Sequence, residues 1–211
     1  MRYKVIPVTS FHQNCSLVWC EEKNEAIVID PGGEIELLLP IITSLSLVVK
    51  KILLTHGHVD HVAGAKELSD YYKVPIVGPH FADRWLLNNI EIQCCMLNFN
   101  IVPPVVPDFW LLDHEIVMVG NVQFEVLHCP GHSPGHLIFW DKKSRFIFMG
   151  DVLFNGSIGR TDLPGGNMSD LIHSIKKVIS LGDDILFLPG HGPKSTLGHE
   201  RIYNNCIQHF I

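Results

Sequence analysis

The sequence predicts an α/β fold in which two mixed β-sheets pack face to face between outer helices, an αββα sandwich. Hydrophobic residues make up 46% of the 211 residues, which is enough to form a buried core. The apolar stretches that favour strands come in two batches, and each batch contains segments that favour helices. Several of these strands end directly before a histidine or an aspartate. We expect residues 1–211 to form one domain, since chains of this length commonly do.

Short apolar runs bounded by turn residues predict the strands of the first half. These strands are residues 3–9, 15–20, 26–29, 51–54 and 74–77. Helices are expected at residues 35–47, 61–72 and 81–89. Pro40 lies inside the first helix and can break it, because proline donates no backbone hydrogen bond. The stretch 79–109 is ambiguous as a whole, because a proline-rich loop at residues 103–107 follows its helical part.

The second half is predicted to consist mostly of strands. These strands are residues 116–119, 123–128, 137–140, 145–149 and 185–188. One helix is expected at residues 168–180, and a short terminal helix is expected at residues 198–211. Each half therefore supplies one sheet and the helices that cover it.

Composition and charge argue against nucleic acids and membranes as partners. The chain has 16 Lys and Arg against 22 Asp and Glu, so its net charge of −6 does not attract phosphate backbones. Residues 1–8 lack the apolar stretch of a signal peptide, and the apolar stretch 37–49 is shorter than the ~20 residues of a membrane span. We expect a cytoplasmic protein whose six cysteines, none in a C-x-x-C pair, stay reduced.

Histidine is the unusual residue of this composition, with 13 copies. Several predicted strands lead directly into a histidine or an aspartate, and strand ends can converge at one edge of a sheet. Imidazole nitrogens and carboxylate oxygens are ligands that suit zinc, iron or manganese. The candidate ligands selected in this way are His56, His58, Asp60, His61, His132, Asp151 and His191.

The remaining histidines are expected to lie on the surface or to form ordinary hydrogen bonds. They are His12, His80, His114, His128, His136, His173, His199 and His209. Among them His136 is closest to the candidate ligands, and it can either orient a ligand or simply begin a strand.

The run His56-x-His58-x-Asp60-His61, followed by His132, Asp151 and His191, resembles the metallo-β-lactamase superfamily over almost the whole chain. The resemblance implies two divalent metal ions, with zinc expected and iron or manganese as alternatives. It implies that one metal is held by His56, His58 and His132, and the other by Asp60, His61 and His191, with Asp151 bridging them. In this family an aspartate at the position of Asp30 commonly bonds to the ligand loop; its alternative role here is a turn residue before Pro31.

Two segments, residues 150–162 and 189–192, are similar to glyoxalase II and related hydroxyacylglutathione hydrolases. This similarity implies hydrolysis of small-molecule thioesters such as S-lactoylglutathione, as in methylglyoxal detoxification. A hydroxide shared by the two metals would attack the carbonyl, with Asp60 and Asp151 as catalytic residues. Only residues 192–211 follow His191, whereas glyoxalase II has a longer helical region that binds glutathione. The chain therefore resembles the short, single-domain type, and we expect glutathione thioesters to bind weakly.

Two other functions remain open from the sequence. Persulfide dioxygenases share a segment like residues 159–162, and they bind one iron through residues that match His56, His132 and Asp151. A metal-binding or interaction module without catalysis is the second alternative. Arg160 has two possible roles, pairing with a carboxylate to hold its loop or binding an anionic substrate. The sequence does not predict the oligomeric state.

Overall fold

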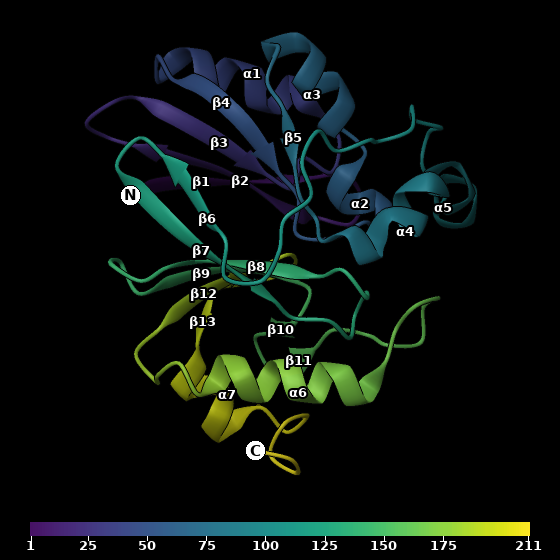
Figure 1. The fold of residues 1–211 in the computed structure, drawn as a ribbon, viewed down its shortest axis with the longest axis vertical. Coiled ribbons are helices and arrows are strands. Elements are labelled where there is room, and N and C mark those ends of the chain that lie inside the picture. Colours follow the sequence, from purple (N-terminus) through teal and green to yellow (C-terminus); the bar gives the residue numbers. More distant parts are fainter.

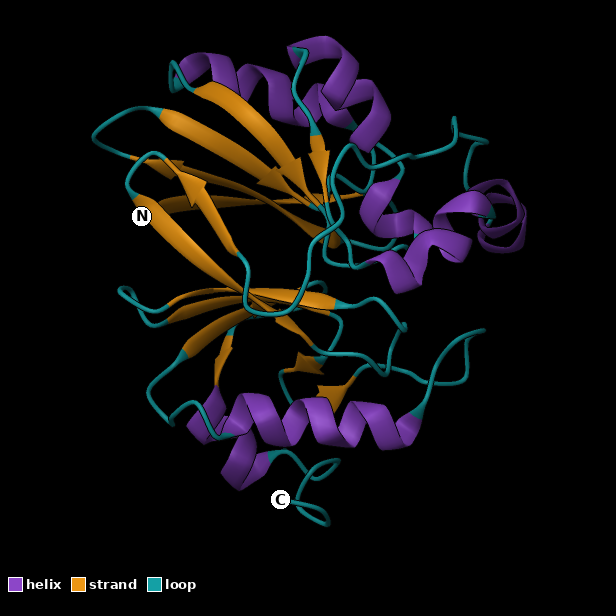
Figure 2. Ribbon diagram, in the orientation of Figure 1, coloured by secondary structure: helices purple, strands orange, loops and turns teal.

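The computed structural model describes residues 1–211 and shows four layers, with two β-sheets between two layers of helices (Figures 1 and 2). The predicted αββα sandwich is thus confirmed. The first sheet has the order β1 (Arg2–Val8), β2 (Gln13–Cys20), β3 (Glu25–Ile29), β4 (Val48–Leu53) and β5 (Ile76–Val77). The second has the order β13 (Ser195–Thr196), β12 (Leu186–Pro189), β9 (Phe146–Gly150), β8 (Leu137–Asp141), β7 (Val122–His128) and β6 (Ile116–Val119).

Helices cover the outer face of each sheet (Figure 1). The outer face of the first sheet carries α1 (Ile35–Ser44) and α3 (Ala65–Tyr72), and that of the second carries α6 (Met168–Ile179) and α7 (Leu197–Tyr203). Shorter elements gather at one end of the sandwich: α2 (Val59–Val62), η1 (Phe81–Asp83), α4 (Arg84–Asn88), α5 (Ile90–Leu97), β10 (Leu153–Phe154) and β11 (Ser157–Ile158). None of the helices is long and apolar enough to cross a lipid bilayer.

Both sheets are mixed, and their parallel pairs determine where the polar loops lie. β3 pairs in parallel with β4 in the first sheet, and β9 pairs in parallel with β12 in the second. The carboxyl ends of parallel neighbours meet at the same edge of a sheet. The residues that follow these four strands are therefore brought together at one end of the sandwich.

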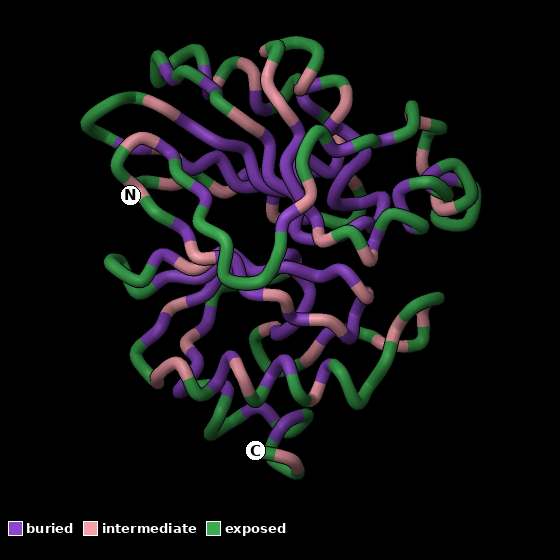
Figure 3. Tube along the Cα trace, in the orientation of Figure 1, coloured by how far each residue is buried: buried purple, intermediate pink, exposed green.

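The strands of both sheets are largely buried (Figure 3), and strand alternation divides their residues among three apolar layers. In β3, Ala26 and Val28 pack toward the helices while Ile27 and Ile29 pack between the sheets. In β9, Phe146 and Phe148 pack between the sheets, and Ile147 and Met149 pack toward α6. Successive strand residues point to opposite faces, so strands buried on both sides are apolar throughout, as these are.

The helix predicted at residues 61–72 is in fact two helices, α2 and α3, separated at Gly64. The backbone N–H of Gly64 donates to the carbonyl of Pro31 at 2.8 Å, and a Cβ at this position would lie 2.9 Å from Cγ2 of Ile35. This close approach leaves no room for a side chain at the junction of α2 and α3, which explains the glycine there. Pro40, in contrast, lies within α1 without breaking it.

Other predicted elements also differ from the structure. The terminal helix predicted at residues 198–211 is wrong beyond Tyr203, where turns replace it. The helix predicted at residues 81–89 is divided between η1 and α4, and α5 was not predicted. The two-residue strands β10, β11 and β13 were not predicted either, because so short a strand shows no alternation of apolar and polar residues.

Candidate metal centre

The candidate ligands lie together at one end of the sandwich, on loops that follow the strands. Asp151 comes directly after β9, and His56 and His191 follow within three residues of the ends of β4 and β12. His132 lies in the loop between β7 and β8, and Asp60 and His61 lie in α2. The parallel pairing described above explains how ligands that are more than a hundred residues apart in the chain become neighbours.

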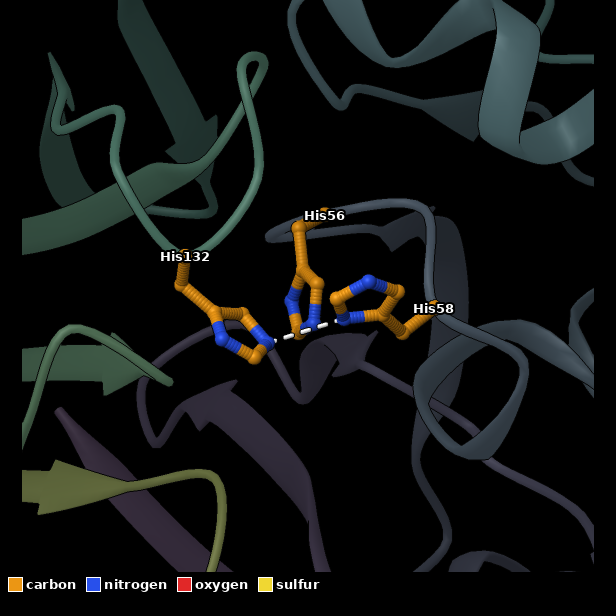
Figure 4. A group of neighbouring side chains, drawn as sticks. All are labelled: His56, His58 and His132. Atoms are coloured by element: carbon orange, nitrogen blue, oxygen red, sulfur yellow. Dashed lines mark hydrogen bonds between the residues drawn. The ribbon is translucent and has the colours of Figure 1, made fainter. Parts of the chain in front are cut away.

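Three histidines form the first cluster, with ligand atoms that all lie within 4.8 Å of one another (Figure 4). Nδ1 of His58 faces Nε2 of His132 at 2.8 Å, and Nε2 of His56 is buried without any hydrogen-bond partner. Burial and the nearby His132 lower the pKa of His58 to about 3, so its ring is neutral and its nitrogen has a free lone pair. Such a group of imidazole nitrogens fits a divalent cation between them.

The second cluster consists of Asp60, His61 and His191. Nε2 of His191 lies 3.1 Å from Oδ2 of Asp60, and Nε2 of His61 lies 3.8 Å from the same oxygen. Nε2 of His61 is also buried without a hydrogen-bond partner. A carboxylate and two imidazoles are again a donor set for zinc, iron or manganese.

Asp151 lies between the two clusters. Its Oδ1 is 3.4 Å from Nε2 of His61, and its Oδ2 is 3.6 Å from Nε2 of His132 and 3.7 Å from Nε2 of His191. Burial alone would raise the pKa of Asp151, but the nearby histidines lower it by more than burial raises it. The net pKa is therefore lowered, and the carboxylate is ionised. Oδ1 has no hydrogen-bond partner although it is buried, which is costly unless a cation lies beside it.

Taken together, the unpartnered atoms of His56, His61 and Asp151 show that this donor set fits two metal ions. We call the seven residues of the two clusters and Asp151 the metal centre. All seven candidate ligands predicted from the sequence fall within it, and their arrangement is consistent with a dinuclear site.

Hydrogen bonds on the far side of the rings orient these histidines. Nδ1 of His132 donates to the carbonyl of Arg160 at 2.8 Å, and Nδ1 of His191 donates to the carbonyl of Phe11 at 3.1 Å. A carbonyl can only accept, so Nδ1 carries a proton in both rings, and Nε2 is the nitrogen left to bind a metal. Such partners fix the tautomer and the direction of metal-binding histidines.

Asp30 performs this orienting role for His61. Its Oδ2 accepts from Nδ1 of His61 at 2.8 Å and from Oγ1 of Thr55 at 2.6 Å, and its Oδ1 accepts from the backbone N–H of Thr55 at 2.7 Å. Oγ1 of Thr55 also lies 3.0 Å from Nδ1 of His56. Because these contacts occupy both oxygens of Asp30, we interpret it as an orienting residue rather than as a ligand.

His136 and Arg160 also contact the metal centre, His136 with its ring and Arg160 with its backbone carbonyl. Nε2 of His136 accepts from the backbone N–H of Asp151 at 2.9 Å, and the His136 ring stacks on His56 with centroids 4.7 Å apart. His136 both positions the aspartate and directly precedes β8. The exposed guanidinium of Arg160 donates to both oxygens of Asp162, at 2.8 and 2.7 Å, so it is the Arg160 carbonyl that contacts His132.

Two further residues that hold the ligand loops were not predicted from the sequence. Asp83 is buried and accepts from the backbone of Gly57 at 2.8 Å and from Oγ of Ser133 at 2.7 Å, which ties the His56–His58 loop to the His132 loop. Asn14 donates to the carbonyls of Pro189 and Gly192 on either side of His191. Neither residue belongs to a motif. Each bonds to residues that are far away in the sequence, so no local sequence pattern indicates its role.

A cavity of about 770 Å³ opens onto the metal centre. The cavity is lined by five residues of the metal centre: His58, Asp60, His132, Asp151 and His191. Side chains of α4, α5 and the β10–β11 hairpin form its other walls. A small molecule in this cavity would contact the candidate ligands directly.

Comparison with known proteins agrees with this geometry. Residues 8–191 match the family described as the metallo-beta-lactamase superfamily. The chain is 45% identical to the hydroxyacylglutathione hydrolase GloC of Haemophilus influenzae over 97% of both chains. The crystal structure of TTHA1623 in a di-iron-bound form is similar with a TM-score of 0.88 and 36% identity, over 96% of this chain and 98% of that one. The BLEG-1 B3 metallo-beta-lactamase is similar with a TM-score of 0.90 and 33% identity, over 98% and 99%.

Proposed function

This chain belongs to the metallo-β-lactamase superfamily, and from that premise we propose that it hydrolyses thioesters, with S-lactoylglutathione or a related hydroxyacyl thioester as substrate. Its membership and its histidine and aspartate clusters make it a metal-dependent hydrolase of this fold. The similarity to GloC supports the thioester as the bond that is broken.

The observation that carries the proposal is the position of Asp151 between two complete clusters at the base of a cavity. In our assignment His56, His58 and His132 would hold one ion, Asp60, His61 and His191 would hold the other, and Asp151 would be shared by both. Bound divalent ions would supply Lewis-acid chemistry, which lowers the pKa of a water molecule and polarises the carbonyl. Zinc, iron and manganese all suit these ligands.

The proposed reaction adds water across the carbon–sulfur bond. The oxygen of water forms a bond with the acyl carbon, the carbon–sulfur bond breaks, and the sulfur takes the electron pair and a proton. The products are a carboxylic acid and a thiol. Asp60 lines the cavity, and we assign its carboxylate to orienting the attacking water, while Asp30 and His136 keep His61 and Asp151 in position.

The decisive experiment measures metal content and hydrolysis on the same preparation. The purified protein is loaded separately with zinc, manganese or ferrous iron, and the thiol released from S-lactoylglutathione is measured. We expect about two ions per chain, activity that a chelator abolishes, and activity that returns with metal. A β-lactam substrate is included because of the similarity to BLEG-1.

The other outcomes separate the alternative functions. One iron per chain together with oxygen consumption on a persulfide substrate would identify a dioxygenase instead. A fully loaded protein that hydrolyses no thioester would indicate a binding module. His173→Ala is the control variant, because His173 is exposed on α6 and its ring donates only to the carbonyl of Ser169.

A further inference from the structure

We infer that the cavity selects thioesters whose non-reacting part is apolar and uncharged, such as a medium-length alkyl or acyl chain. This inference rests on the proposed function and specifies its substrate class. It follows from the chemistry of the side chains that line the cavity around the metal centre.

The first wall of the cavity is formed by α4 and α5. Its apolar side chains are Trp85, Ile92, Met96 and Leu97. Ile92 and Met96 are one helical turn apart and therefore lie on the same face of α5. They are 58% and 71% exposed, although the opposite face of α5 packs into the core through residues such as Cys94. An exposed apolar face on a helix whose other face is already buried indicates a surface that binds something.

The second wall lies across the cavity and is also apolar. Phe154 and Ile158 of the β10–β11 hairpin line it, together with Leu163. Phe11, whose ring stacks on Phe99 with centroids 5.2 Å apart, lines the cavity beside His191. A chain that extends from the metal centre would therefore contact apolar side chains from both sides. We call these two surfaces the apolar walls.

Away from the metal centre, the side chains that line the cavity offer an anionic substrate little positive charge. Arg160 is the only lysine or arginine among the residues that line it, and its guanidinium is already paired with Asp162 through two hydrogen bonds. Gln93, the polar residue of α5 in the lining, bonds to the backbone of Val59 and Gly57 and is thereby occupied. The carboxylates of glutathione or the phosphates of coenzyme A would meet little that compensates their charge.

The first test is kinetic and uses thioesters of a neutral thiol, N-acetylcysteamine, with acyl chains from acetyl to octanoyl. A second series keeps the acetyl group and lengthens an uncharged S-alkyl part. We expect kcat/KM to rise about two- to fourfold per methylene in one of the two series, because each buried methylene contributes roughly that factor. The series that responds identifies which side of the thioester contacts the apolar walls. A flat response in both series, with measurable turnover, would overturn the inference and leave the proposed function intact.

The second test does not require turnover. The affinity of non-hydrolysable S-alkyl thioethers of N-acetylcysteamine for the metal-loaded protein is measured by calorimetry. We expect affinity to increase with chain length in the same ratio, and Ile92→Ser and Met96→Ser to reduce this increase by at least half. Met118→Ser is the matched control, since Met118 is 43% exposed on β6 and does not line the cavity. Chain-length-dependent binding without hydrolysis of any thioester would support the pocket and reject the thioesterase.

A second copy of this chain is the other possible occupant of the exposed face of α5. Light scattering after size-exclusion chromatography distinguishes the two cases. If Met96→Ser converts a dimer into a monomer and leaves the chain-length dependence unchanged, the face is a dimer interface and the inference is wrong. If the oligomeric state is unchanged and the dependence weakens, the face binds substrate.

Discussion

The metal centre and the apolar walls lie against each other, yet they are built in opposite ways. At the metal centre, His56 and His61 are fully buried, and the outer nitrogen of His61 is bonded to Asp30. In the apolar walls, Ile92 and Met96 are exposed and contact mainly solvent. Polar ligands need fixed directions, whereas apolar contacts are non-directional and tolerate change.

This difference separates chemistry from substrate choice within one cavity. A substitution at the metal centre should affect every substrate, because it alters the reacting groups. A substitution in the apolar walls should change which substrates are held and leave the metal content alone. The following variants test this division, from the largest expected effect to the smallest.

Asp151→Ala should abolish hydrolysis of all thioesters and lower the metal content below two ions per chain. Asp151 contacts ligands of both clusters, so its loss removes the one carboxylate that the two clusters share. Turnover and metal content of the purified variant are the measurements. Asp70→Ala, which removes an exposed aspartate paired only with Lys66, is the control. Near-normal turnover of Asp151→Ala would contradict the assignment of the metal centre.

Asp30→Asn should weaken metal affinity and activity by about 10- to 100-fold, the usual effect of losing a group that orients a ligand. The carboxylate of Asp30 accepts from both Thr55 and His61, and an amide cannot accept at every one of these contacts. Metal titration against a competing chelator measures the loss. Asp141→Asn makes the same change at a buried aspartate that accepts from the turn at Lys143 and Ser144, and it should leave metal affinity unchanged.

Glu200→Ala should raise KM several-fold and lower the free energy of unfolding by about 1–3 kcal/mol, with metal content unchanged. Glu200 is fully buried in α7, and it accepts from the backbone of Gly156 in the β10–β11 hairpin and from Asn204. Its loss should loosen the hairpin that carries Phe154. Chemical denaturation and steady-state kinetics measure the two effects, and Glu67→Ala on the exposed side of α3 is the control. A parallel loss of metal would show that the hairpin also supports the metal centre.

Arg160→Ala should have the smallest effect, on the order of a few-fold in KM for anionic thioesters, with stability and metal content retained. The exposed guanidinium bonds only to Asp162, while the backbone carbonyl that orients His132 is kept in the variant. Metal analysis, thermal melting and kinetics with S-lactoylglutathione test this. Arg145→Ala is the control, since it removes another exposed ion pair, with Asp184, that does not line the cavity. A drop in metal content would instead assign the Arg160 side chain to holding its loop.

The sequence predicted the ligands better than it predicted the walls. His56, His58, Asp60 and His61 are close together in a motif that follows an apolar strand, so a local pattern reports them. The helix α5 has no such pattern, because Ile90 and Ile92 are both apolar while one is buried and the other faces the cavity. An apolar residue in the sequence does not indicate whether it contacts the core or a ligand.

The sequence by itself determined the two batches of strands, the αββα order and the identity of the candidate ligands, because strand alternation and the spacing of histidines are local properties. The resemblance to the superfamily already implied which ligands share a metal and that Asp151 lies between them. Only the tertiary structure decided that Asp83 and Asn14 hold the ligand loops, and how closely the seven ligands approach one another. The parallel pairing of β3 with β4 and of β9 with β12 brings these residues together. The apolar walls likewise exist only because α5 and the β10–β11 hairpin, some 60 residues apart in the chain, face the same cavity once the two sheets have packed.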